Sequence, residues 1–84
     1  MELTFEESEL KLSKEQIIEV IDNGSDFDLA PSQRGNDRLM FVGFTHEGEL
    51  GEVGVEFLSE TKWHVFHAMP ATKPYRELFG QKRK

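Results

Sequence analysis

The chain has 84 residues and no cysteine, which indicates one domain with a small core and excludes disulfide bonds, thiolate metal ligands and a cysteine nucleophile. Its formal net charge of -6 disfavours general binding to nucleic acid. No stretch is apolar enough to be a membrane span or a secretory leader, so we expect a single domain over residues 1–84 that acts in the cytoplasm without a membrane partner.

The charge is unevenly distributed along the chain. Residues 1–26 carry two lysines against eight acids, and residues 27–72 carry three basic residues against seven acids. Residues 73–84 reverse this balance, with five basic residues against one acid. Because charges more than about 8 to 10 Å apart are largely screened, this basic segment can hold a phosphate locally. Its last part, residues 81–84, is expected to be a flexible basic tail.

Two capping boxes predict two helices at the N-terminus. The sequences TFEE at residues 4–7 and SKEQ at 13–16 both have a hydroxyl residue three positions before Glu or Gln, an arrangement that satisfies free amide groups at a helix start. The second helix is also amphipathic, with Ile17, Val20 and Ile21 on one face. Gly24 is expected to end it in a left-handed conformation.

The rest of the chain alternates like strands. Apolar and polar residues alternate around Val53, Val55 and Phe57, as in a half-buried strand. We therefore expect a two-layer α+β fold, with two N-terminal helices packed on a four-stranded, mainly antiparallel sheet and a short C-terminal helix, in which the helices cover one face of the sheet. The expected strands cover about 27–29, 39–45, 53–57 and 63–69, and the last helix covers 74–80.

Alternation also divides the side chains of the last strand. It places Trp63, Val65 and His67 on one face and His64, Phe66 and Ala68 on the other. His64 and His67 would then diverge, and no third histidine or cysteine stands near them. We therefore expect neither a metal site nor a cofactor.

The stretch HAMPATKPYRELF at residues 67–79 gathers side chains suited to metal-free RNA cleavage. A histidine such as His67 can act as base or acid, Lys73 and Arg76 can bind phosphate, and Tyr75 can donate a hydrogen bond or stack on a base. The same residues also have an ordinary structural interpretation. In that interpretation His67 is a hydrogen-bonded residue at a strand end, Tyr75 is a core residue, and the two cations are surface charges.

Several motifs along the chain resemble those of the BrnT-like toxins of bacterial type II toxin-antitoxin systems, which share the RelE/ParE-type fold. These motifs are VGFT at 42–45, HEGEL at 46–50, GEVGVEF at 51–57 and HAMP at 67–70. The resemblance covers about residues 13–79. It implies a ribosome-independent ribonuclease that a cognate antitoxin binds and silences, with His67 as the motif histidine.

Two other functions remain open at this stage. One is a protein of the same fold that has lost catalysis and binds an antitoxin or a second copy of itself. The acidic body favours this function, whereas the basic C-terminal segment favours RNA cleavage. The other is a domain that binds a small ligand, for which the apolar strands are the only support.

Overall fold

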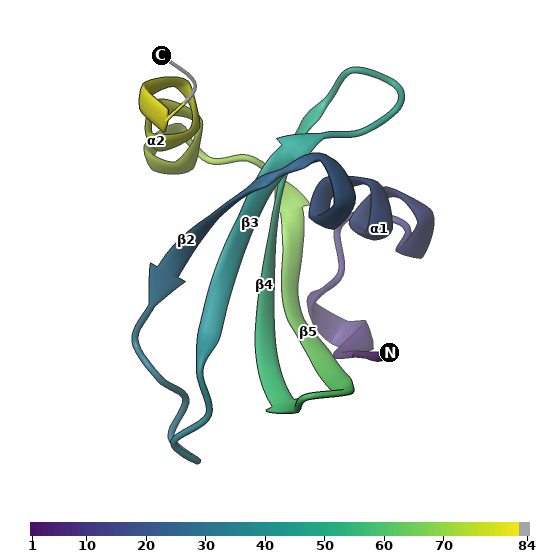
Figure 1. Ribbon diagram of the computed structural model, residues 1–84. Helices are drawn as coiled ribbons and strands as arrows, with labels where there is room; N and C mark the ends of the chain where they lie inside the picture. Colours follow the sequence, from purple (N-terminus) through teal and green to yellow (C-terminus); the bar gives the residue numbers. More distant parts are fainter. Residues whose placement is uncertain (83–84) are drawn as a thin grey trace.

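The computed structural model describes residues 1–82. Five strands form one mixed sheet in the order β1-β5-β4-β3-β2. Strand β1 runs parallel to β5, and the other neighbouring pairs are antiparallel. Figure 1 shows α1 and α2 at the two sides of this sheet. The elements in chain order are β1 (Glu2–Phe5), the 3-10 turn η1 (Glu7–Glu9), α1 (Lys14–Asn23), β2 (Ser25–Leu29), β3 (Arg38–Phe44), β4 (Leu50–Ser59), β5 (Lys62–Pro70) and α2 (Lys73–Lys82).

The predicted four-stranded sheet with two N-terminal helices is wrong, because the helix predicted to begin at residues 4–7 does not form and its start belongs to a fifth strand, β1. Residues 2–5 extend along the edge of β5, where Leu3 lies opposite Trp63 in the pairing register. Phe5 packs against the main core. The acidic residues after it form only the single turn η1, without a side-chain cap. Apolar contacts made along an extended chain therefore override the capping signal at residues 4–7.

The second capping box is confirmed. The Ser13 side chain accepts a hydrogen bond from the Gln16 amide, and the Gln16 side chain accepts one from the Ser13 amide. The predicted left-handed end at Gly24 is wrong, since this residue is extended, with φ -91°. Gly24 is instead required by space: a Cβ atom there would lie 2.4 Å from the Val20 carbonyl oxygen.

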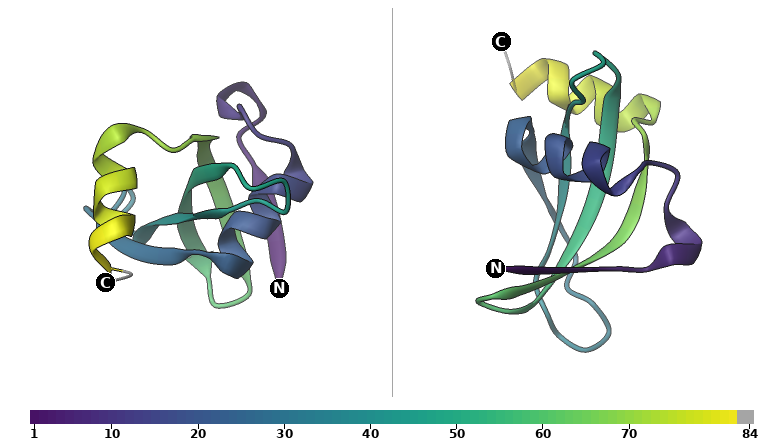
Figure 2. Two further views of the ribbon diagram at one scale, coloured as in Figure 1. Left: turned by 90° about the horizontal axis from the view of Figure 1, so that it is seen from above. Right: turned by 90° about the vertical axis from the view of Figure 1, so that its right-hand side faces the viewer.

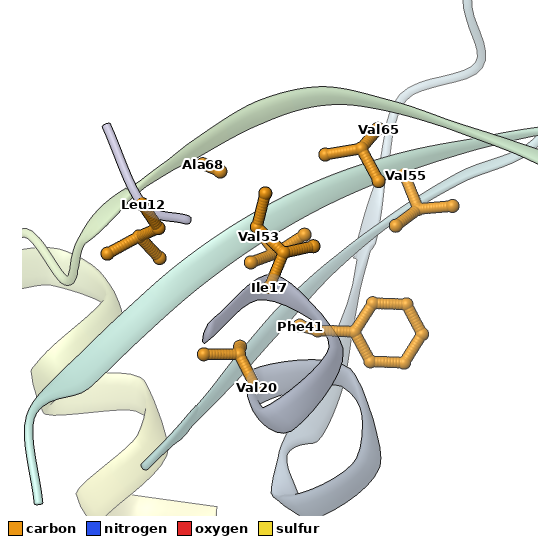
Figure 3. Close-up of a cluster of buried hydrophobic side chains, with 8 residues drawn as sticks. All are labelled: Leu12, Ile17, Val20, Phe41, Val53, Val55, Val65 and Ala68. Carbon is orange, nitrogen blue, oxygen red and sulfur yellow. The ribbon is translucent and has the colours of Figure 1, made fainter. Parts of the chain in front are cut away.

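The main core lies between α1 and one face of the sheet, as Figure 3 shows. The apolar stripe of α1 places Ile17 and Val20 against valines on the strands, and both are fully buried. β-Branched side chains pack well on such a pleated surface, which favours strands under this helix. The cluster contains Leu12, Ile17, Val20, Phe41, Val53, Val55, Val65 and Ala68.

A smaller core lies on the opposite face of the sheet. There Phe79 of α2 packs with Met40 and Val42 of β3. The two helices therefore lie on opposite faces of the sheet (Figure 2), whereas the sequence had predicted both on one face. The difference arises because α2 carries its own apolar stripe, Tyr75 and Phe79, to the face that α1 leaves open.

A β-bulge in β5 changes the predicted faces of its side chains. Gly54 pairs with His67 but its neighbour Val55 pairs with Val65, so Phe66 is an extra residue. The Phe66 ring lies over Gly54, on the face opposite the main core. The bulge therefore places the side chains of Phe66 and His67 on the same face. The prediction that His67 shares a face with Val65 and Trp63 is wrong.

The C-terminal helix is longer than predicted and includes the first half of the expected tail. It continues past Gly80 to Lys82, whose ammonium group donates to the Asp26 backbone oxygen at 2.6 Å. The rest of that tail, residues 83–84, lies outside the described residues. Within residues 1–82, no helix is long and apolar enough to cross a membrane.

Candidate functional site

A buried carboxylate marks the sheet face that carries α2. Glu52, Gly54 and Glu56 alternate along β4 with valines of the main core, so the side chains of both glutamates point to the opposite face. The residue exposure of Glu52 is only 3%. A carboxylate this buried needs partners that replace water.

Both oxygens of Glu52 have such partners. One oxygen lies 2.7 Å from Nε2 of His67. The other accepts two hydrogen bonds from Thr72, from its backbone N–H and from its hydroxyl, each at 2.7 Å. Since Thr72 directly precedes α2, the carboxylate ties the bulge of β5 to the start of this helix.

The hydrogen bonds keep Glu52 ionised. Burial alone would raise its pKa, but the two bonds from Thr72 and the contact with His67 outweigh it, and the pKa of Glu52 lies below its ordinary value. The positive end of the helix dipole at the start of α2 also favours a negative charge here. Glu52 is therefore a fixed anion.

The fixed anion determines the tautomer of His67. An ionised carboxylate only accepts hydrogen bonds, so Nε2 of His67 carries the hydrogen in the 2.7 Å contact. In the neutral ring, Nδ1 is then the nitrogen that can accept a proton. The His67 side chain is 31% exposed, whereas that of Glu52 is 4% exposed. The pair thus combines an accessible base with a buried orienting group, an arrangement used in general acid-base catalysis.

The other predicted site residues lie on α2. Lys73 and Arg76 are exposed in its first turn, and the Arg76 amide donates to the Thr72 carbonyl oxygen at 2.9 Å. Tyr75 instead packs edge-on against Phe27, with ring centroids 6.3 Å apart. The structure therefore joins His67 to Thr72 through Glu52, with the two cations following Thr72 along the chain. The Tyr75 ring packs against the smaller core.

Sequence reasoning missed Glu52 and Thr72. The alternation of β4 indicated that Glu52 and Glu56 face outward, and such acids are usually solvated. Their burial depends on α2 and on the 31–37 loop, which reach this face from distant parts of the sequence. The only local sign of this burial in the sequence was the pair of acids that flank a glycine on one face of an apolar strand.

Glu56 is a second buried acid on the same face, with a different set of partners. It accepts hydrogen bonds from Arg34 and Asn36 of the 31–37 loop, both at 2.9 Å. These bonds, with a smaller contribution from Ser32, lower the pKa of Glu56 to about 2 although burial opposes the shift. Glu56 therefore anchors this loop to the sheet.

The Glu56→Gln variant should be less stable at neutral pH by about 1.5 to 3 kcal/mol, the range for hydrogen bonds to a charged group. The pKa falls from 4.5 in the unfolded chain to about 2 in the folded one. The stabilisation is then complete above about pH 5 and is lost as the pH falls towards 2. Urea unfolding at several pH values should thus show a difference between wild type and variant that shrinks in acid.

The matched control for this experiment is Glu60→Gln, which changes an exposed acid in the turn after β4. It should alter neither the stability at pH 7 nor its pH dependence. A difference between Glu56→Gln and wild type that stays constant from pH 7 to pH 3 would contradict the role assigned to the ionised Glu56.

No group of three or more histidine, aspartate or glutamate side chains within residues 1–82 is arranged to hold a metal ion. Comparison of the chain with protein-family models, curated proteins and solved structures gives no match. The resemblance to BrnT-like toxins thus stays a prediction, and the function has to be argued from the site itself.

Proposed function

We propose that this chain is a metal-independent endoribonuclease of the BrnT-like toxin type, with His67 as the catalytic base and acid. The observation that carries the proposal is the 2.7 Å contact between His67 and the buried, ionised Glu52. The contact holds the ring in the tautomer that leaves Nδ1 free to take a proton. The basic first turn of α2, which follows Thr72, supports the same reaction by supplying cations.

In the proposed reaction, Nδ1 of His67 takes the proton of a ribose 2′-hydroxyl. The 2′-oxygen attacks the adjacent phosphorus, and the bond from phosphorus to the 5′-oxygen breaks. The protonated His67 returns its proton to this leaving oxygen, so the products are a 2′,3′-cyclic phosphate and a 5′-hydroxyl end. Lys73 and Arg76 stabilise the extra negative charge on the phosphate. Tyr75 has no step in this reaction, because its ring packs against Phe27. Its predicted catalytic role stays a prediction.

Cleavage of total RNA by the purified chain in EDTA tests the proposal. We expect cleavage by the wild type, and a loss of about 10²- to 10⁴-fold in His67→Ala, the usual contribution of general acid-base catalysis. Lys73→Ala/Arg76→Ala should also be impaired. The matched control is His46→Ala, because His46 is exposed and pairs with Glu19 at the turn after β3. Intact RNA with the wild-type chain, or equal cleavage by His67→Ala, would rule out this catalytic role.

The second candidate function is binding of another protein, an antitoxin or a second copy of the chain. The observation in its favour is a small hollow of about 160 Å³ formed mainly by the apolar residues Met1, Leu3, Ile18 and Ile21. Ile18 is 44% exposed there. This hollow lies beside α1 and β1, away from the face that carries His67. A protein bound in this hollow fits both a ribonuclease that an antitoxin silences and a chain that only binds proteins. We expect the complex to form in the cytoplasm.

Ile18→Asp tests this second candidate. Light scattering of the purified chain at increasing concentration should reveal a dimer that the variant converts to a monomer, if the partner is a second copy. A wild-type chain that stays monomeric at all concentrations excludes self-association. It leaves the antitoxin as the partner to be tested by co-expression.

A further inference from the structure

An open pocket of about 560 Å³ lies on the same sheet face as His67. It is formed by the 31–37 loop and by side chains of β3 and β4. This loop lies at the end of the sheet opposite α2 (Figure 1). Its polar lining includes Ser32, Arg34, Arg38 and Glu56. The catalytic proposal does not use any of these residues.

Arg38 is held in place in this pocket by two contacts. Its Nε donates to the Ala30 backbone oxygen at 2.8 Å. Its guanidinium carbon lies 5.1 Å from the centroid of the Phe66 ring. Both contacts leave the two terminal nitrogens as donors, and a planar arginine fixed in this way is suited to bind the oxygens of a phosphate.

The charge of Arg38 is not neutralised by an ion pair with any residue of the 1–82 segment. Arg34 is paired with Glu56 at 2.9 Å, and Asn36 also donates to that carboxylate. Asp28 and Asp37 line a second hollow together with Arg38, without forming an ion pair with it. The pocket therefore offers one unpaired, preoriented cation.

Phe66 connects this pocket to the proposed catalytic pair. The bulge places Phe66 and His67 side by side on one face, and the Phe66 ring in turn contacts Arg38. Arg38 is thus separated from His67 by a single side chain. A single-stranded RNA whose scissile phosphate lies at His67 carries further phosphates along the same face.

We propose that the pocket at Arg38 is a phosphate subsite for the single-stranded RNA that His67 cleaves. This inference rests on the proposed ribonuclease function. In it, Arg38 binds a phosphate next to the scissile one, and Phe66 supports both the arginine and the neighbouring base by stacking. The subsite lets an acidic chain hold RNA through a local cationic site.

Binding of a 2′-O-methyl oligoribonucleotide, which cannot be cleaved, tests the subsite by fluorescence anisotropy. Arg38→Gln should weaken binding at least tenfold and reduce the slope of log Kd against log salt by about 0.7, the value for one phosphate contact on a single strand. Arg38→Lys, which keeps the charge but loses the planar fork, should fall in between. The control Lys11→Gln removes an exposed cation of the segment that precedes α1 and should bind like the wild type.

The outcomes separate the subsite from the ribonuclease. Cleavage of total RNA by the wild type, together with equal oligonucleotide binding by Arg38→Gln and Lys11→Gln, would overturn the subsite alone. Binding that depends on Arg38 without any cleavage would support the subsite and overturn the ribonuclease. Absence of oligonucleotide binding by the folded wild type would also overturn the subsite.

Discussion

Glu52→Gln should lower RNA cleavage by about 10²- to 10⁴-fold while the chain stays folded. Glutamine has nearly the same shape as glutamate, but it replaces one accepting oxygen with a donating NH₂ group. In the wild type both oxygens of Glu52 accept, one from His67 and one from the two donors of Thr72. A single amide cannot satisfy both sides in the same way.

The two orientations of the glutamine amide have different costs. If its oxygen faces Thr72, its NH₂ group donates to Nε2 of His67, the ring hydrogen moves to Nδ1, and Nδ1 can no longer take a proton. If its oxygen faces His67, the NH₂ group meets the backbone N–H of Thr72, which can only donate, in a buried site, and this destabilises the fold. The first orientation is less costly, so we expect inactivation through the wrong tautomer.

Initial rates of oligonucleotide cleavage in EDTA, together with ¹⁵N chemical shifts of the His67 ring, check this prediction. The shifts should move the hydrogen of the neutral ring from Nε2 in the wild type to Nδ1 in Glu52→Gln. The control Glu49→Gln changes an exposed acid just before β4 and should leave both readouts unchanged. Full activity in Glu52→Gln, with its tautomer shifted, would show that the pair does not orient a catalytic base.

The stability of Glu52→Gln should also change with pH in a defined direction. Because the pKa of Glu52 is lowered by folding, its ionised form stabilises the wild type above the ordinary pKa of a glutamate. This contribution is lost as the pH falls. The stability difference between the wild type and the variant should therefore be largest near neutral pH and smaller in acid.

The sequence was sufficient for elements whose signals are local. The capping box at Ser13 and the apolar stripe that includes Ile17 and Val20 predict α1, and the structure has a helix there. The same capping pattern at residues 4–7 failed, because Leu3 and Phe5 gain more from lying along β5 than from starting a helix. That competition depends on β5, some 60 residues away along the chain, which no local pattern reveals.

The candidate site depended even more on distant contacts. His67 was identified from its chemistry, but strict alternation placed it on the wrong face, since one extra residue at the bulge shifts the pattern. Its partner Glu52 is 15 residues away along the chain and looked like a solvated acid. A dyad that is assembled across two strands and a helix start leaves no fixed spacing in the sequence.

Gly24→Ala should be the most destabilising of the single-methyl changes, by about 3 kcal/mol, at the upper end of the range for overpacking. A Cβ atom at Gly24 would lie 2.4 Å from the Val20 carbonyl oxygen and 2.8 Å from that of Val42. Both atoms belong to the backbone, one to α1 and one to β3, so neither can rotate away. Relief requires the helix to move off the sheet, which loosens the main core.

Gly43, which faces Gly24 from β3, also shows that α1 and β3 lie too close together for an added methyl group. A Cβ atom at Gly43 would lie 2.6 Å from the Cα atom of Gly24, so α1 ends against β3 through two facing glycines. A domain of this size is expected to have a total stability on the order of 4 to 12 kcal/mol. A loss of about 3 kcal/mol should then lower Tm by roughly 15 °C.

Thermal unfolding followed by circular dichroism checks this prediction against Gly80→Ala. Gly80 lies in α2, and a Cβ atom there meets nothing within 4 Å. Alanine should therefore raise stability by up to about 1 kcal/mol, because it has the higher helix propensity. The same added methyl group thus has opposite effects at the two positions. If Gly24→Ala melts within about 2 or 3 °C of the wild type, its loss of stability is well under 1 kcal/mol. This result would mean that α1 is not held against β3 as closely as these distances require.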